Sequence, residues 1–258
     1  MTTAVHSAAF VDPAAELGMG VEIGPGAVIG PQVRIGDRSR VGSHALITGK
    51  TTLGIGCRVH HGAVLGTPPQ DLKFGGEKTA LEVGDDTEIR EYATLNVACD
   101  EGQVTRVGSH CLLMAYVHVA HNCRLGDHVI VANASQFAGY VTIEDWAIVG
   151  GLTAVHQFVR IGCHAFVGGG SRIAQDVAPY VLIAGSPPRH AGINRIGLER
   201  RGFTPAKREA IERAYRILFR DGLNLDEAVE RLRTEFSGMD EIEHLARFAE
   251  TSTRGLSR

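Results

Sequence analysis

The sequence is poor in aromatic residues and in proline, and it contains no long apolar run. Aromatic side chains make up 6% of its 258 residues, and proline occurs only 9 times. No apolar stretch approaches the roughly 20 residues that a membrane-spanning helix needs. The N-terminal segment, MTTAVHSAAFVDP, lacks the basic region and apolar core of a secretory signal. We therefore expect no stable membrane insertion and a cytoplasmic location.

Charge is also scarce, and the cysteines form no CxxC pair. Charged residues make up 21% of the chain and the net charge is −3, which argues against a nucleic-acid binder. Glycine, in contrast, is abundant with 32 copies, which favours many tight turns over one large aromatic core. An odd number of cysteines is typical of reduced thiols in a cytoplasm. They are Cys57, Cys99, Cys111, Cys123 and Cys163.

An aliphatic residue recurs at every sixth position over most of the chain. The position two residues earlier is small or β-branched, which puts both side chains on one face of a short strand. A short strand followed by a turn, repeated with a period of six, predicts a parallel β-helix in which each coil is buried by its neighbours. The series runs from Ile23 to Leu65, resumes at Val83, Ile89 and Leu95, and continues from Val107 to Ile173.

Two stretches interrupt this series, at residues 67–80 and 98–104. Charged side chains occupy the aliphatic positions there, and they could not line an apolar core. We predict two loops that leave the solenoid, and long loops on a rigid scaffold often carry function. Cys57, Cys111 and Cys123 fall on the small inward position, so we interpret them as core residues rather than as ligands or nucleophiles.

The repeat fades after Ile173, and signals for helices follow. We place the β-helix at residues 1–184 and a small C-terminal α-helical domain at residues 185–258, with residues 186–190 (SPPRH) as a linker. An N-cap residue before proline, or an acidic residue at a helix start, marks three expected helices. They begin at Thr204–Pro205, at Asp226 and at Asp240.

The first of these helices has an apolar face and a basic face. Arg213, Arg216 and Arg220 point away from the apolar side chains. Residues 185–220 carry nine Lys and Arg against three Asp and Glu, and residues 221–250 carry the reverse. The arginines therefore either balance the acidic residues within the domain or dock an acidic partner.

One coil of a three-sided solenoid takes eighteen residues, so residues eighteen apart stack at a strand spacing of about 4.8 Å. Three histidines then gather on one edge within two coils, which predicts a site. One column holds His121, Gly139 and Gln157, the next holds His118, Gln136 and Ala154, and His156 adjoins Gln157.

Two chemistries suit this cluster. Histidines on a hexapeptide solenoid can bind zinc between subunits, as in the γ-class carbonic anhydrases. Alternatively, one histidine is a general base that removes a proton from a hydroxyl group. Because no further ligand or carboxylate lies on the same column, we favour the general base and expect no metal site.

Five motifs resemble the UDP-N-acetylglucosamine O-acyltransferases, the first enzymes of lipid A synthesis. The resemblance covers nearly the whole chain and is more specific than the hexapeptide pattern. It implies a homotrimer of left-handed β-helices that uses no cofactor, with active sites between subunits. The motifs are PQDLKF (69–74), HVAHNC (118–123), GGLTAVHQF (150–158), AQDVAPY (174–180) and GLERRGF (197–203).

The resemblance also implies a reaction and roles for individual residues. A 3-hydroxyacyl chain would pass from acyl carrier protein to a UDP-amino sugar. His121 would be the general base, oriented by Asn122, and the backbone N–H of Gly139 would stabilise the oxyanion. Gly169 would limit the acyl length. From the basic face of the first helix, and not from the resemblance, we expect Arg213, Arg216 and Arg220 to dock the acidic carrier. The implied substrate-binding residues are Asp71, Lys73, His118, His156, Gln157, Asn194, Arg200 and Arg201.

The chain departs from its relatives at three positions. Asn122 stands where a carboxylate often follows the base, and Asn96 and Tyr140 stand where many relatives have histidine. These departures leave open whether the acceptor is UDP-GlcNAc or its 3-amino analogue.

Other functions compete with this one. The related N-acyltransferase usually carries an N-terminal uridine-binding domain, for which we expect no room here. A CoA-dependent hexapeptide acetyltransferase would not explain the motifs in the C-terminal segment. A zinc carbonic anhydrase would contain metal, which metal analysis of purified protein would detect. A structural solenoid would not need the histidine column.

Overall fold

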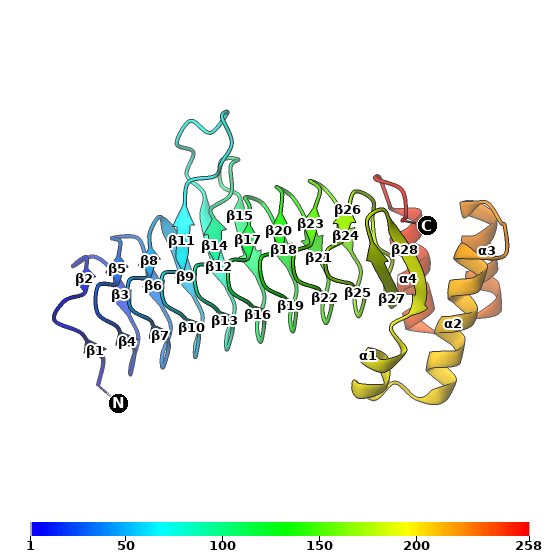
Figure 1. Ribbon diagram of the computed structural model, residues 1–258, viewed down its shortest axis with the longest axis horizontal. Coiled ribbons are helices and arrows are strands. Elements are labelled where there is room, and N and C mark those ends of the chain that lie inside the picture. The colour runs from blue at the N-terminus through cyan, green and yellow to red at the C-terminus, as the bar shows by residue number, and fades with distance from the viewer. Residues whose placement is uncertain (1, 258) are drawn as a thin grey trace.

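The chain forms an elongated parallel β-helix that ends in a group of helices (Figure 1). The computed structural model describes residues 2–257. Short strands alternate with tight turns, and every third strand joins the same sheet, so the solenoid has three faces. No helix of the described residues is long and apolar enough to cross a membrane.

Three sheets run along the solenoid. The eleven-stranded sheet contains β1 (Ala4–Val5), β4 (Glu22–Ile23), β7 (Arg40–Val41), β10 (Arg58–Val59), β13 (Glu88–Ile89), β16 (Leu112–Leu113), β19 (Ile130–Val131), β22 (Ile148–Val149), β25 (Phe166–Val167), β27 (Val181–Gly185) and β28 (Pro188–Ile193). The nine-stranded sheet contains β2 (Phe10–Val11), β5 (Val28–Ile29), β8 (Leu46–Ile47), β11 (Val64–Thr67), β14 (Thr94–Asn96), β17 (His118–Val119), β20 (Gln136–Phe137), β23 (Ala154–Val155) and β26 (Arg172–Ile173). The eight-stranded sheet contains β3 (Glu16–Leu17), β6 (Arg34–Ile35), β9 (Lys50–Leu53), β12 (Ala80–Val83), β15 (Val104–Val107), β18 (Arg124–Leu125), β21 (Thr142–Ile143) and β24 (Arg160–Ile161).

The predicted aliphatic series forms the core. Each of its members from Ile23 to Ile173 is at most 4% exposed. Cys57, Cys111 and Cys123 are buried among them, as the sequence predicted. Burial raises the pKa of the Cys57 and Cys111 thiols to about 11 and that of Cys123 to about 12, so these thiols stay protonated and act as small apolar groups.

The strand register confirms both predicted loops. In a regular coil, Arg40 pairs with Arg58, which lies eighteen residues later. Across the first loop, Arg58 pairs with Glu88, thirty residues later. Across the second loop, Glu88 pairs with Leu112, twenty-four residues later. The extra residues leave the solenoid between β11 and β12 and between β14 and β15, and they project from its side (Figure 1). Both loops lie where the nine-stranded sheet turns into the eight-stranded sheet. We call this edge, which includes residues 68–79, 97–103, 120–123, 138–141 and 156–159, the loop corner.

The turns use glycine less for flexibility than for close approach. A Cβ atom on Gly36 would lie 2.5 Å from the carbonyl oxygen of Gly54 in the next coil, so a glycine after the aliphatic position lets the coils stack. The left-handed turn residues are often large instead, and they stack between coils. Trp146 (φ 63°) lies on His128 (φ 58°) with ring centroids 3.8 Å apart.

The C-terminal segment differs from the expectation in two places. Residues 186–190 are not a linker, because β28 pairs antiparallel with β27 and continues the eleven-stranded sheet across the expected domain division at residue 184. A short helix precedes the three expected ones, which begin within two residues of their predicted starts. The helices are α1 (Arg195–Arg200), α2 (Pro205–Phe219), α3 (Leu225–Glu235) and α4 (Asp240–Glu250).

Candidate active site

His121 lies at the loop corner, in the turn between β17 and β18, with its imidazole fixed by the next residue. Its Nδ1 is 2.9 Å from Oδ1 of Asn122. An amide oxygen can only accept a hydrogen bond, so Nδ1 carries a proton, and in the neutral imidazole Nε2 then keeps its lone pair. The side chain therefore has the tautomer that a base acting through Nε2 needs.

Gly139 lies one coil away, against the His121 ring. A Cβ atom at this position would be 2.4 Å from Cε1 and 2.6 Å from Nε2 of His121, so only glycine allows the ring to lie there. Tyr140 N–H donates to the His121 carbonyl at 3.0 Å, which confirms the predicted stacking of this column. Within residues 2–257 the N–H of Gly139 has no acceptor, so it is available to an oxygen of a ligand.

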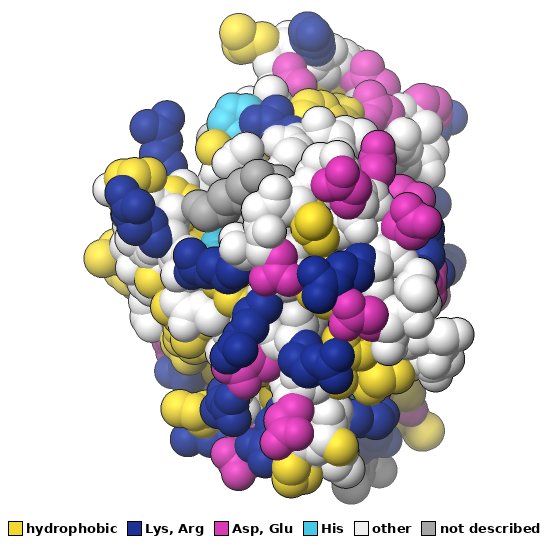
Figure 2. All heavy atoms as spheres, turned by 90° about the vertical axis from the view of Figure 1, so that its right-hand side faces the viewer, with side chains coloured by type: hydrophobic (Ala, Val, Ile, Leu, Met, Phe, Trp, Pro, Cys, Tyr) yellow, Lys and Arg dark blue, Asp and Glu magenta, His cyan; other side chains and the backbone are white. Residues whose placement is uncertain are grey.

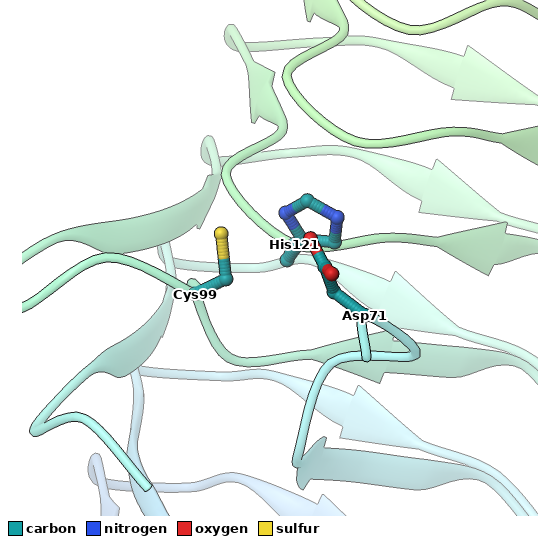
Figure 3. Close-up of side chains that lie close together, drawn as sticks. All are labelled: Asp71, Cys99 and His121. Carbon is teal, nitrogen blue, oxygen red and sulfur yellow. The ribbon is translucent and has the colours of Figure 1, made fainter. Parts of the chain in front are cut away.

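The loops bring acidic and thiol groups to His121 that the column pattern did not contain. Asp71, Cys99 and His121 place their ligand atoms within 4.8 Å of one another, and the Asp71 carboxylate points toward the imidazole (Figure 3). Asp71 and Cys99 come from the two loops and not from the stacked column, because a repeat pattern does not say how its loops fold back. Lys73 is exposed beside Asp71, whose Oδ1 accepts the Lys73 N–H at 2.9 Å.

Cys99 contacts Tyr140, which lies beside the His121–Gly139 column. The Cys99 thiol is 3.3 Å from the Tyr140 hydroxyl, and burial raises its pKa. The Tyr140 hydroxyl also donates to Oδ2 of Asp100 at 2.6 Å, and this bond raises the tyrosine pKa. The Tyr140 ring meets the His121 imidazole edge-on, with centroids 5.3 Å apart. Sequence reasoning assigned no role to Tyr140, and no signal in the sequence pointed to Asp100.

Asn122 is buried and connects His121 to the second loop. Its backbone has φ 60°, a left-handed conformation that asparagine tolerates better than most residues. Its Oδ1 also accepts the Cys99 N–H at 3.0 Å, and its Nδ2 donates to Gln103 Oε1 at 2.7 Å and to Asp100 Oδ2 at 3.3 Å. The structure thus gives Asn122 the orienting contact that the resemblance implied.

His118 occupies the predicted neighbouring column. It pairs in register with Thr94 and Gln136, and its Nδ1 is 2.7 Å from the Thr94 hydroxyl. Burial, and then the nearby His121, lower its pKa, so it is neutral at pH 7. Asn96 is buried and donates from Nδ2 to the Thr67 hydroxyl at the base of the first loop.

His156 and Gln157 lie exposed two coils along from His121. Nη2 of Arg254, from the C-terminal tail, is 3.1 Å from Nδ1 of His156, so the tail reaches this column. Sequence reasoning did not identify Arg254.

The residues expected at the nucleotide end lie on a different corner of the chain. Asn194 caps α1 through a bond from the Gly197 N–H, and its Nδ2 donates to the His164 carbonyl at 2.9 Å. The Arg201 guanidinium lies over the Trp146 ring, 5.2 Å from the centroid. Trp146 and His164 belong to turns between the eight- and eleven-stranded sheets, so one chain does not bring this group to His121. Arg200 is exposed at the end of α1.

Gly169 lies on the third corner, in the turn between β25 and β26. It is exposed, and a Cβ atom there would be 3.0 Å from the Gly151 carbonyl. One chain therefore does not bring Gly169 beside His121 either.

The outer face of the eleven-stranded sheet carries an apolar row that the sequence analysis missed. These side chains follow one another in register over five strands and are partly exposed. They belong to Leu112, Ile130, Ile148, Phe166 and Leu182. An apolar strip of this kind on a rigid sheet is typical of an interaction surface.

The three arginines of α2 are exposed but not free, contrary to the expectation. Arg213 lies 3.2 Å from Glu235 and over the Phe236 ring, and Arg216 lies 3.7 Å from Glu212. Arg220 donates to the Tyr215 hydroxyl at 3.1 Å. Figure 2 shows Lys and Arg side chains interspersed with acidic ones over this end of the molecule. Part of the basic face is thus balanced within the domain.

Comparison with known proteins shows which family the chain belongs to. The family described as UDP N-acetylglucosamine O-acyltransferase, domain 2, matches residues 176–257, and the bacterial transferase hexapeptide family matches residues 14–49 and 105–139. The acyl-[acyl-carrier-protein]–UDP-N-acetylglucosamine O-acyltransferase of Syntrophobacter fumaroxidans is 43% identical over 98% of this chain and 99% of its own. The enzyme of the same name from Chlamydia caviae is 43% identical over 99% of this chain and 92% of its own.

Solved structures agree with the sequence relatives. The UDP-N-acetylglucosamine acyltransferase of Bacteroides fragilis superposes with a TM-score of 0.95 at 40% identity, over 98% of this chain and 99% of that one. The Acinetobacter baumannii protein gives 0.95 at 38% identity, over 98% and 99%. The solenoid is a left-handed parallel β-helix, an exception to the right-handed crossovers that parallel strands otherwise prefer.

Proposed function

Because the chain belongs to the acyl-[acyl-carrier-protein]–UDP-N-acetylglucosamine O-acyltransferase family, we propose that it acylates position 3 of a UDP-linked amino sugar. The acyl donor is a 3-hydroxyacyl thioester of acyl carrier protein, and the reaction is the first step of lipid A synthesis. The acceptor is UDP-GlcNAc or its 3-amino analogue.

His121 acts as the general base in this proposal. Its Nε2 takes the proton of the acceptor hydroxyl, or amine, while the oxygen or nitrogen attacks the thioester carbonyl. The N–H of Gly139 donates to the oxyanion that forms, which contributes about 3 kcal/mol in comparable sites. When the C–S bond breaks, the proton on Nε2 passes to the carrier thiolate. The observation that carries the proposal is the contact of the His121 ring, whose Nδ1 is held by Asn122, against Gly139.

The proposed enzyme is a homotrimer with its sites between subunits. The catalytic group lies at the loop corner, whereas Asn194, Arg200 and Arg201 lie on another corner, so a second copy is needed to complete a nucleotide site. The apolar row on the eleven-stranded sheet supports this assembly, because it offers a partly exposed surface for a neighbouring copy or the acyl chain.

The proposed reaction uses no metal and takes place in the cytoplasm. Cys99 is a weak candidate ligand, because burial favours its protonated thiol and a metal binds the thiolate. Free thiols at all five cysteines agree with a reducing compartment. Metal analysis of purified protein tests the first point: a stoichiometric metal that is lost in Cys99→Ser and His121→Ala would overturn it.

The function is tested by offering both acceptors with a series of 3-hydroxyacyl carrier proteins and measuring acylated sugar by mass. We expect acyl transfer from the carrier to one acceptor and none to other nucleotide sugars. His121→Ala should lower kcat by at least about two orders of magnitude while the oligomer remains folded. No transfer to either acceptor, or full activity in His121→Ala, would contradict the proposal.

A further inference from the structure

The amide of Asn122 has two possible orientations, and they have opposite effects on His121. With the oxygen toward the imidazole, Nδ1 of His121 must be protonated and Nε2 is free to act as the base. With the amide turned over, its NH₂ group would face Nδ1, which would then accept, and the proton would move to Nε2. A histidine protonated at Nε2 cannot accept a proton there. The orientation of one amide therefore decides whether the base is competent.

Neighbours of fixed polarity hold the amide in the productive orientation. The Cys99 backbone N–H, which can only donate, meets Oδ1 of Asn122 at 3.0 Å. The Asp100 carboxylate, which can only accept, meets Nδ2 at 3.3 Å. Gln103 also accepts from Nδ2, but its own amide can turn over with that of Asn122, so it cannot set the direction.

The position of Asp100 is itself fixed. The Tyr140 hydroxyl donates to the same Oδ2 atom at 2.6 Å, and the second loop is tied to the first by bonds from the Lys78 N–H to Glu101 and from the Gly102 N–H to the Lys78 carbonyl. Asp100 therefore meets Asn122 as part of a connected network rather than as a mobile surface side chain.

We propose that Asp100 is a positioning residue that fixes the amide of Asn122 and thereby the tautomer of His121. The inference rests on the proposed function only in naming the step that benefits. Here the acidic group lies in the second loop and acts through the asparagine, and Tyr140 anchors it.

The test compares Asp100→Ala with Glu101→Ala, which removes a neighbouring carboxylate of the same loop that does not touch Asn122. Nitrogen NMR of the imidazole reports the tautomer of His121 without any substrate. We expect Asp100→Ala to increase the Nε2-protonated form and to lower kcat about 10-fold, with KM for the UDP-sugar nearly unchanged. Glu101→Ala loses the bond from the Lys78 N–H but keeps Asp100 bonded to Tyr140 and Asn122, so it should change the tautomer and kcat much less than Asp100→Ala does. Asp100→Asn should retain most of the activity, because its amide oxygen can occupy the same place.

Repeating the Asp100 substitution in an Asn122→Asp variant distinguishes a positioning role of Asp100 from a general structural role. In Asn122→Asp the group beside His121 has no amide to turn over, so the tautomer no longer depends on residue 100. Adding Asp100→Ala to this variant should therefore cost little further activity. An unchanged tautomer in Asp100→Ala, or an equal loss of kcat in both backgrounds, would overturn the inference.

Two further points keep the result interpretable. If Asp100→Ala does not fold, Asp100→Ser provides the same measurement with a smaller loss of polar contacts. Because the tautomer is read without substrate, a protein that lacks the proposed acyltransferase activity would still reveal whether Asp100 acts on His121.

Discussion

Gly139 and Asn122 show how little freedom the candidate active site leaves to individual residues. Gly139 cannot carry a Cβ atom because the His121 ring occupies that place, and Asn122 must adopt a left-handed backbone while its side chain makes four hydrogen bonds. The requirement at Gly139 arises from a contact between stacked coils, whereas the Asn122 side chain meets His121 and residues of the second loop.

Gly139→Ala should displace the His121 ring and lower kcat at least about 10-fold, because the added methyl group would lie 2.4 Å from Cε1. Gly30→Ala is the matched control, since its Cβ atom would meet the Thr48 hydroxyl oxygen at 3.3 Å, far from the site. Steady-state kinetics and thermal unfolding of both variants provide the comparison. A fully active Gly139→Ala enzyme would show that the ring does not act from this position.

Gly169→Met should shift the acyl preference toward shorter chains, because in the proposed assembly the acyl chain of the donor extends past this corner. Gly169 is exposed, so a methionine side chain can extend from the turn. Gly169→Ala is the control for the tight contact with the Gly151 carbonyl, 3.0 Å from the added Cβ atom. Turnover of a series of acyl lengths gives the answer, and an unchanged profile would place the limit elsewhere.

The hexapeptide period predicted the His121–Gly139–Gln157 column because stacking repeats every eighteen residues. It could not predict Asp71, Cys99 or Asp100 beside His121, because the loops fold back through contacts that have no period. The family resemblance identified Asp71 as a site residue, whereas the place of Asp100 beside Asn122 is seen only in the folded structure.

Among the elements, β28 and α2 show why composition alone is an unreliable guide to function. Proline-containing residues 186–190 indicated a linker, yet β28 extends a sheet edge, where a missing N–H is tolerated. The basic face of α2 indicated free arginines. Arg213, however, contacts Glu235, the last residue of α3, and the ring of Phe236, which follows it. The composition or charge of one strand or helix does not predict which neighbouring element it contacts.

The α2 arginines still offer a graded test of carrier docking. Arg216→Glu and Arg220→Glu together should raise KM for the acyl carrier substrate several-fold at low salt, because these groups are exposed and only weakly paired within the chain. KM for the UDP-sugar should not change. Arg213→Glu, which breaks a contact with Glu235, should lower stability as well. Normal use of the carrier at low salt by the double variant would mean that this face serves only the fold.

At the scale of the whole molecule, an ion pair joins the helical tail to the β-helix. Nε2 of His244 in α4 is 2.7 Å from Glu144, one hundred residues earlier. Hydrogen bonds to Cys163 and then to Glu144 raise the His244 pKa to about 10, although burial opposes this and Arg247 lies 3.3 Å from its Nδ1. The protonated histidine therefore stabilises the docked tail.

This ion pair predicts a pH dependence of stability. The pKa of His244 is higher in the folded than in the unfolded chain, so its contribution is complete below about pH 6.5 and is lost as the pH rises toward 10. His244→Gln should lower the melting temperature by about 2–4 °C at pH 6 and by less at pH 9. His6→Gln, in the first coil, is the control. An equal loss at both pH values would mean that His244 contributes by packing alone.

The regular register also sets the order in which the chain can fold. The parallel strands pair with partners sixteen to thirty residues away, so successive coils can form one after another, each closing only a short loop. The contact between α4 and Glu144 spans one hundred residues and must wait until the coils around it exist. During synthesis the turn that holds His121 can therefore form before the helical tail has emerged, and docking of the tail comes last.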